Sequence, residues 1–190
     1  MLGQALQFLL ETAIGLLTFA LLLRFYMQLL KTSFRNPVGE FVVAVTDWLV
    51  RPARRVIPGL FGLDLASLLP AWALQAMLLL LIYWLKGFVF AGAPGIATGV
   101  LLTLAILEIL KFSIYLLIVC VIVQVLMSWT NPYAPLAPLF NSLTRPFLRP
   151  FQRLIPPIGN VDLSPLFVLV LAQLALILIA HGYRVIAGMF

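Results

Sequence analysis

Residues 51–58 read RPARRVIP, and residues 149–156 read RPFQRLIP, so one basic, proline-containing phrase occurs twice in the chain. The similarity extends upstream to an Asn-Pro pair and downstream to an aspartate and a glutamine in each copy. An internal repeat of this length predicts two copies of one structural unit. We place the first unit at residues 1–98 and the second at residues 99–190.

The composition predicts an integral membrane protein. Hydrophobic residues make up 64% of the chain and charged residues 9%, whereas soluble domains have roughly 45–50% and 25%. Four apolar stretches are long enough to cross a hydrocarbon core of roughly 30 Å, at about residues 5–30, 65–85, 99–129 and 163–187. The expected fold is therefore all-α, with about four transmembrane helices arranged as two parallel span-loop-span repeats.

The third stretch is longer than a membrane requires. Its 31 residues would extend about 46 Å as a helix, so it is expected to tilt, kink or protrude. The sequence leaves open whether residues 96–110 belong to this span or form a separate interfacial segment.

The distribution of positive charge predicts the orientation of the bundle. The two long loops, residues 31–63 and 130–162, hold eight of the twelve lysines and arginines. Because short cytoplasmic loops are enriched in these residues, we expect both loops on the cytoplasmic side of the bacterial inner membrane and both termini outside. Glu11 interrupts the first apolar run, and no basic segment precedes it, so the N-terminal stretch is expected to be retained rather than cleaved as a signal peptide.

Each long loop is expected to form an amphipathic helix in the membrane interface. Glu40, Asp47 and Arg51 share one helical stripe in the first loop, and the remaining positions leave a wide apolar face. Six arginines are predicted to contact anionic lipid headgroups or a partner: Arg51, Arg54, Arg55, Arg145, Arg149 and Arg153. Turns at the ends of the loop helices are predicted at Asn36, Pro37, Pro52, Pro58, Asn131, Pro132, Pro150 and Pro156, because proline interrupts helices.

Two pairs of repeated polar residues have alternative interpretations. Asp64 and Asp162 each precede an apolar run, where a carboxylate can cap a helix. Gln75 and Gln173 lie about three turns further on, where a buried amide can join neighbouring helices. The alternative is that these four residues form a polar site where the two units meet.

The sequence contains no constellation typical of catalysis or metal binding, so we expect a non-enzymatic protein without a cofactor or a metal. The single Cys120 lies within an apolar run, and the single His181 lies near an interface. The charged residues Glu11, Arg24, Glu108 and Lys111 stand within apolar stretches. Such residues are costly in lipid unless they reach an interface, find a partner or line an ion pathway.

The repeated pattern resembles a known family. Two copies of Asn-Pro, then TxxxxRPxxRxIP, Asp and Gln between paired spans resemble the YggT family of bacterial inner-membrane proteins, also found in cyanobacteria and plastids. The resemblance covers about residues 19–183. The first copy departs from it, with Trp48 where the second has Pro146 and Ser67 where the second has Pro165.

Members of that family are associated with osmotic-stress or potassium phenotypes, cell division, nucleoid distribution and assembly of a photosynthetic cytochrome complex. The resemblance therefore implies an accessory or assembly factor linked to the cell envelope, division or membrane-complex biogenesis. The alternative is a small solute or ion transport component. The expected partners are anionic lipid headgroups and a membrane protein, with a homo-oligomer left open and no direct contact with nucleic acid.

Overall fold

The computed structural model describes residues 2–57, 63–87, 94–131, 133–154 and 162–188. Within these ranges the helices are α1 (Leu2–Leu29), α2 (Pro37–Val56), α3 (Leu65–Leu85), α4 (Pro94–Thr130), α5 (Ala137–Leu154) and α6 (Ser164–Ala187). In the described part of the chain, α1, α3, α4 and α6 are long and apolar enough to cross a membrane. The predicted all-α membrane fold with four spans is confirmed.

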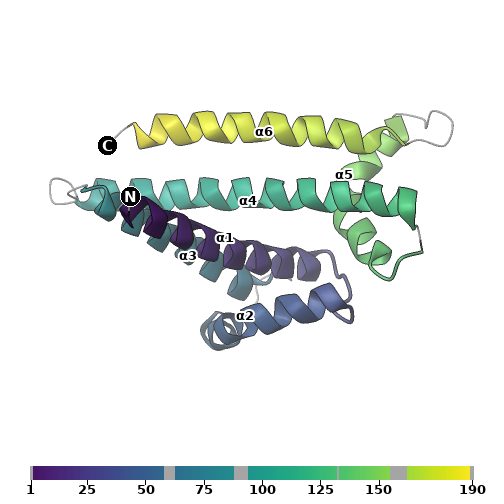
Figure 1. Ribbon diagram of the computed structural model, residues 1–190, viewed down its shortest axis with the longest axis horizontal. Coiled ribbons are helices and arrows are strands. Elements are labelled where there is room, and N and C mark those ends of the chain that lie inside the picture. The colour runs from purple at the N-terminus through teal and green to yellow at the C-terminus, as the bar shows by residue number, and fades with distance from the viewer. Residues whose placement is uncertain (1, 58–62, 88–93, 132, 155–161, 189–190) are drawn as a thin grey trace.

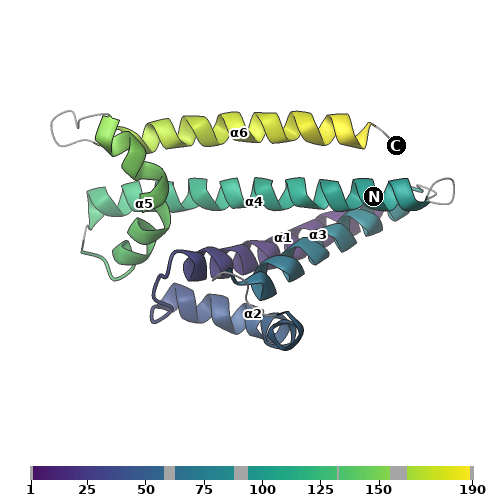
Figure 2. The same cartoon turned by 180° about the vertical axis from the view of Figure 1, so that it is seen from behind.

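The two units run in the same direction. In Figure 1, α4 repeats the course of α1, and α6 repeats the return course of α3. Because each unit contains two spans, α2 and α5 each connect the span ends that lie away from the N- and C-termini, and these termini lie together at one end of the molecule in both views (Figures 1 and 2).

The spans pack around α4. Helix α1 packs on α3 in the first unit, α6 packs on α4 in the second, and α4 also contacts both α1 and α3. Leu21 and Leu22 of α1 are fully buried at this junction together with Leu116 of α4. Helix α6 is the outermost span, since only 11% of its most apolar window is buried. Apolar side chains left exposed on it are compatible with lipid as the surrounding solvent.

Helix α4 is one continuous helix of 37 residues. It would measure about 55 Å along its axis, which is more than a perpendicular crossing of the bilayer requires. Residues 96–110 therefore belong to the same helix as the third span rather than to a separate segment. Within it, the Glu108 carboxylate and the Lys111 ammonium form an ion pair at 2.5 Å.

The Asn-Pro pair begins the first amphipathic helix. The Asn36 side chain accepts a hydrogen bond from the Gly39 backbone N–H at 2.8 Å, and Pro37 occupies the first turn. Proline suits that position because the first N–H groups of a helix have no partner within it. A side chain at Gly39 would clash, since its Cβ would lie 2.6 Å from the Phe34 carbonyl oxygen. In the second unit, Asn131 accepts from the Tyr133 N–H at 3.1 Å, and Pro132 lies outside the described residues.

The prediction that Pro52 and Pro150 end the amphipathic helices is wrong. Both residues lie inside helices, which continue to Val56 and Leu154. An internal proline removes one backbone hydrogen bond and bends the helix, but both prolines are exposed, where water can bind the freed carbonyl. The second prolines of the phrase, Pro58 and Pro156, lie outside the described residues.

Candidate functional site: two basic helices at one end of the bundle

The six arginines predicted to contact lipid all have exposed side chains on α2 or α5. Each amphipathic helix turns its opposite face to the spans of its own unit. Val42 and Val50 of α2 are buried where this helix packs on α1 and α3. Leu148 of α5 is buried in a cluster with Val121 of α4 and Val168 of α6. The apolar faces therefore pack mainly on protein, which fixes the direction in which the arginines project.

Large apolar side chains flank this basic surface. Phe41 and Trp48 on α2 are each 64% exposed, and Leu154 on α5 is 77% exposed. Trp is enriched at membrane interfaces because its ring is apolar while its N–H is polar. The flanks of both helices thus offer contacts with acyl chains, while the arginines offer contacts with headgroups.

Only two of the six arginines form ion pairs among the described residues. The Arg51 guanidinium lies 2.7 Å from Asp47, and that of Arg54 lies 2.9 Å from Asp64. Within the described ranges, the remaining four have no ion-pair partner in the chain: Arg55, Arg145, Arg149 and Arg153. Helix α5 carries three arginines and no acid, whereas α2 carries three arginines and two acids. Of the two helices, α5 therefore carries the larger uncompensated positive charge.

A buried arginine of α1 binds α2 through an ion pair and a hydrogen bond. The Arg24 side chain is 6% exposed, lies 2.9 Å from the Asp47 carboxylate and donates a 2.8 Å hydrogen bond to the Thr46 hydroxyl. Breaking one side of a buried ion pair costs about 3–5 kcal/mol. Of the alternatives that the sequence leaves open for Arg24, the structure shows a partner, which the sequence pattern did not name. The available signal was charge complementarity between an arginine in a span and an acid on the amphipathic loop.

The second unit uses neutral groups at the corresponding place. The hydroxyl of Thr144, the repeat counterpart of Thr46, lies within hydrogen-bond distance of the Gln124 side-chain oxygen of α4 and 2.8 Å from the Phe140 carbonyl oxygen, and its one hydrogen can be donated to either. The counterpart of Asp47 is Arg145, which is exposed. In both units the repeated threonine thus contacts a polar side chain of the preceding span, and only in the first unit is that side chain charged.

The two predicted capping aspartates have different surroundings. Asp64 occupies the N-cap position of α3, but its side chain makes no cap hydrogen bond. It instead accepts from the Arg54 guanidinium at 2.9 Å and the Ser67 hydroxyl at 2.6 Å. Asp162 precedes the N-cap residue Leu163 of α6, and its carboxylate accepts from the Ser164 backbone N–H at 2.8 Å.

The repeated contact of each aspartate is with the preceding amphipathic helix. Gln152 stands at the repeat position of Arg54 and donates to Asp162 at 2.9 Å. Partial burial raises the pKa of Asp162, but the hydrogen bonds from Gln152 and Ser164 outweigh this effect and lower its pKa below the ordinary value. Each aspartate thus ties the end of an amphipathic helix to the start of the following span.

The structure does not bring the two glutamines together. Gln75 is 2% exposed and donates a 2.9 Å hydrogen bond to the Thr18 hydroxyl across the α1–α3 contact. Gln173 is exposed on α6, because α6 contacts α4 through a different face. A symmetric site that combines Gln75, Gln173 and both aspartates is therefore not formed.

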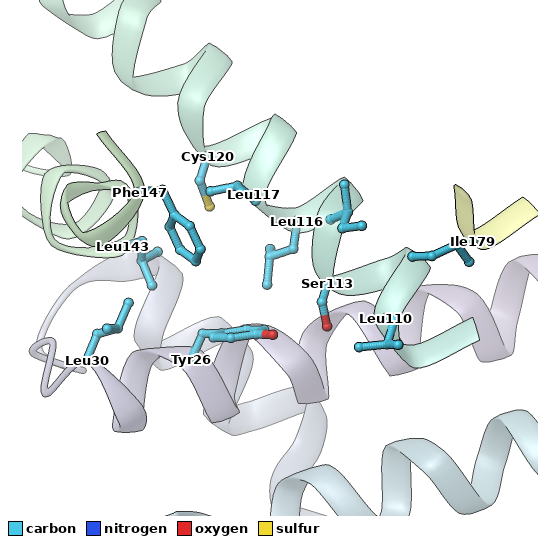
Figure 3. Close-up of a pocket in the computed structure, with 11 residues that line it drawn as sticks. Tyr26, Leu30, Leu110, Ser113, Leu116, Leu117, Cys120, Leu143, Phe147 and Ile179 are labelled. Atoms are coloured by element: carbon cyan, nitrogen blue, oxygen red, sulfur yellow. The ribbon is translucent and has the colours of Figure 1, made fainter. Parts of the chain in front are cut away.

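The seam, which is the contact region between the two units, contains cavities whose linings differ from one end to the other. Near the termini it contains a cavity of about 390 Å³ lined by both apolar and charged residues. Where α1, α4 and α5 meet, it contains a second cavity of about 260 Å³ with an almost wholly apolar lining. Figure 3 shows Tyr26 of α1, Leu116 of α4 and Phe147 of α5 around this second space, with Ser113 and Cys120 also facing it.

Comparisons with known proteins agree with this repeated architecture. The sequence model of the CCB3/YggT family matches residues 3–85 and 103–182, one segment in each unit. The chain belongs to this family. It is 35% identical to an uncharacterized protein of Pseudomonas aeruginosa over 190 residues, which cover 99% of this chain and 94% of the relative.

Two further relatives align along almost their whole length. The uncharacterized protein YggT of Escherichia coli K12 is 36% identical, with 97% of each chain covered. An uncharacterized protein of Haemophilus influenzae is 32% identical, with 92% of this chain and 93% of the relative covered. No solved structure matches the chain.

Proposed function

We propose that this protein is a non-enzymatic accessory or assembly factor of the bacterial inner membrane. It would display two basic helices to anionic lipid and to a membrane-protein partner on the cytoplasmic side. The observation that carries the proposal is the position of α2 and α5 at the same end of the spans, with all six of their arginines exposed. Two exposed basic helices on the same side of the spans suit docking more than chemistry.

The orientation in this proposal follows from the excess of positive charge at the α2/α5 end. Single cysteines at Arg55 and Arg153, introduced in a Cys120→Ala background, should resist a membrane-impermeant thiol reagent in intact cells. A single cysteine at Gly95, where nothing lies within 4 Å of an added Cβ, should react. Reaction at both arginine positions and not at Gly95 would invert the proposed orientation.

The unpaired arginines supply the sharpest test of the lipid contact. Replacing Arg55, Arg145, Arg149 and Arg153 by Gln should lower the amount of anionic lipid retained on the purified protein, measured by native mass spectrometry. The matched variant with Lys at the same four positions should retain it, because a point charge satisfies a headgroup at about 1 kcal/mol per residue. Unchanged retention in the Gln variant would remove the headgroup role.

The same pair of variants separates lipid from protein recognition. Arginine binds carboxylates through two parallel hydrogen bonds that lysine cannot reproduce. A partner that recognises the guanidinium groups should therefore be lost from both variants in quantitative co-purification from native membranes. Recovery of every wild-type partner by the Gln variant would argue against these arginines as the docking surface.

A second candidate, a solute or ion transport component, is supported by the polar cavity between the units. Toward α2 and α5, however, the seam is apolar (Figure 3), so we expect no robust flux from purified protein in proteoliposomes. The variant carrying Asp64→Asn and Asp162→Asn should complement a deletion strain. If the wild type shows ion-selective flux and the double variant does not, transport would be favoured over the accessory role.

A further inference from the structure

The cavity near the termini lies where both units contribute walls. Its polar lining comes from α1, α3, α4 and α6, and comprises Gln7, Glu11, Gln75, Tyr83, Lys86, Glu108, Lys111 and Tyr183. Leu78, Leu79 and Ile82 of α3 line it with Phe112 of α4. A volume of about 390 Å³ is within the range of roughly 300–1,000 Å³ typical of small-molecule sites.

The charges in this cavity are balanced but not fully paired. Glu108 and Lys111 neutralise each other at 2.5 Å, with side chains 13% and 35% exposed. Glu11 accepts a 2.8 Å hydrogen bond from Gln7. Within the described ranges, neither Glu11 nor Lys86 forms an ion pair in the chain. The cavity therefore has one carboxylate and one ammonium group without an opposite charge in contact.

This arrangement selects against ligands of a single charge. A free cation would meet Lys86 and Lys111, and a free anion would meet Glu11 and Glu108, so each would gain from one pair of groups and be repelled by the other. A ligand that carries an ammonium and an anionic group on a short chain can satisfy both. The leucine, isoleucine and phenylalanine walls would accommodate a hydrocarbon portion attached to it.

We propose that this cavity binds a zwitterionic head consisting of a primary ammonium joined by a short chain to a phosphate diester or carboxylate. Glu11 receives the ammonium hydrogen bonds, Lys86 faces the anionic group, and the Glu108–Lys111 pair lies between the two units beside them. Two sources share this chemistry: an ethanolamine phospholipid from the surrounding leaflet, and a free zwitterionic solute.

Purified full-length protein with Gln in place of Arg55, Arg145, Arg149 and Arg153, which removes the proposed contacts for anionic lipid on α2 and α5, can be titrated calorimetrically in a neutral detergent with four probes. They are dihexanoyl phosphatidylethanolamine, dihexanoyl phosphatidylglycerol, glycerophosphoethanolamine and L-alanine. We expect binding of the ethanolamine lipid at least about tenfold tighter than binding of the glycerol lipid, which lacks the ammonium. Comparable binding of either free zwitterion assigns the site to a solute, and binding of the lipid form alone assigns it to a lipid.

Charge removal tests the residues. Glu11→Gln and Lys86→Gln should each weaken binding by about tenfold, because each removes a charge-assisted contact. The matched variants Glu40→Gln and Lys31→Gln make the same changes at exposed positions near the other end of the bundle and should bind like wild type.

Glu11 and Lys86 are both exposed, so these variants are expected to fold, as size-exclusion chromatography will verify. Should Glu11→Gln aggregate, Glu11→Asp retains the charge but withdraws it by one methylene, and it should also weaken binding. Equal binding of the glycerol and ethanolamine lipids, equal affinity of the cavity variants and their controls, or no binding of any zwitterion would overturn the proposal.

Discussion

In the first unit, Arg24 of α1 reaches Asp47 of α2 through a buried ion pair, whereas in the second unit Gln124 of α4 accepts a hydrogen bond from Thr144 of α5. The same difference recurs at the far end of each amphipathic helix, where Arg54 pairs with Asp64 in the first unit and a neutral glutamine replaces that arginine in the second. The same set of contacts is thus built twice, once with ion pairs and once with at least one neutral partner in each contact.

This comparison teaches how a repeat can divide its tasks. Ion pairs neutralise part of the positive charge on α2 and attach this helix to the neighbouring spans. The neutral contacts of the second unit leave all three arginines of α5 without an acid on their own helix. We infer that the contacts of α2 mainly stabilise the fold and that α5 mainly presents a cationic surface, and four measurements test this division.

The largest effect is expected at the two joints between span and amphipathic helix. Arg24→Met removes the buried partner of Asp47 and should lower the free energy of unfolding by about 3 kcal/mol. Gln124→Met removes only a neutral hydrogen bond and should cost about 0.6 kcal/mol. Denaturation of the purified protein by SDS, followed by circular dichroism, measures both. Similar losses in the two variants would contradict the division of tasks.

The second comparison concerns the aspartates that precede α3 and α6. Asp64 is 4% exposed and accepts from a guanidinium group, so Asp64→Asn should cost about 1.5 kcal/mol. Asp162→Asn should cost only a few tenths, because asparagine can still accept from the Ser164 N–H and caps nearly as well as aspartate. The same denaturation assay applies, and an equal small cost for both would identify Asp64 as a cap rather than an ion-pair partner.

A smaller difference is expected between the two repeated glutamines. Gln75→Leu loses the buried hydrogen bond to Thr18 and should cost about 0.6 kcal/mol, the average for a polar contact between membrane helices. Gln173→Leu places an apolar side chain on an exposed face of α6 and should be neutral or slightly stabilising. A loss in Gln173→Leu that matches the loss in Gln75→Leu would reveal a contact for Gln173 that this conformation lacks.

Much of the fold follows from the sequence because the membrane imposes strong rules on apolar length. Residues 65–85 were predicted as a span and form α3 with these bounds. The amphipathic helices also follow from the sequence, since a helix with one polar stripe and one apolar face is expected to lie at an interface. The prediction that Pro52 and Pro150 end their helices is wrong. Proline removes a backbone hydrogen bond wherever it stands in a helix, but at these exposed positions water can bind the freed carbonyl.

The partners of individual side chains were harder to derive. The ion pair between Arg24 and Asp47 joins residues on two helices whose packing the repeat pattern does not specify. Gln75 and Gln173 stand at equivalent positions of the repeat, but α6 lies at the edge of the bundle and α3 lies inside it. Position in the bundle, rather than position in the repeat, decides which glutamine is buried.

The smallest predicted effect is the pH dependence of the contact between α5 and α6. Hydrogen bonds from Gln152 and Ser164 lower the pKa of Asp162 in the folded protein, so the charged carboxylate stabilises the fold. This contribution is fully present above the ordinary aspartate pKa of about 3.9 and is lost as the pH falls through the lower folded value. Because Asp162 is exposed, solvent screening limits the contribution to well under 1 kcal/mol.

The measurement is the difference in unfolding free energy between wild type and Asp162→Asn, followed from neutral pH to below about pH 4. The difference should be constant near neutrality and should shrink in acid, since protonation gives the wild type a neutral side chain as well. Gln152→Leu should bring the acid-dependent step closer to the ordinary carboxyl pKa, because the strongest stabilising hydrogen bond to the carboxylate is then missing. Gln173→Leu, which changes no titratable group, serves as the control and should show no such step. A difference that grows in acid would mean that the protonated form of Asp162 is the one bound more tightly in the fold.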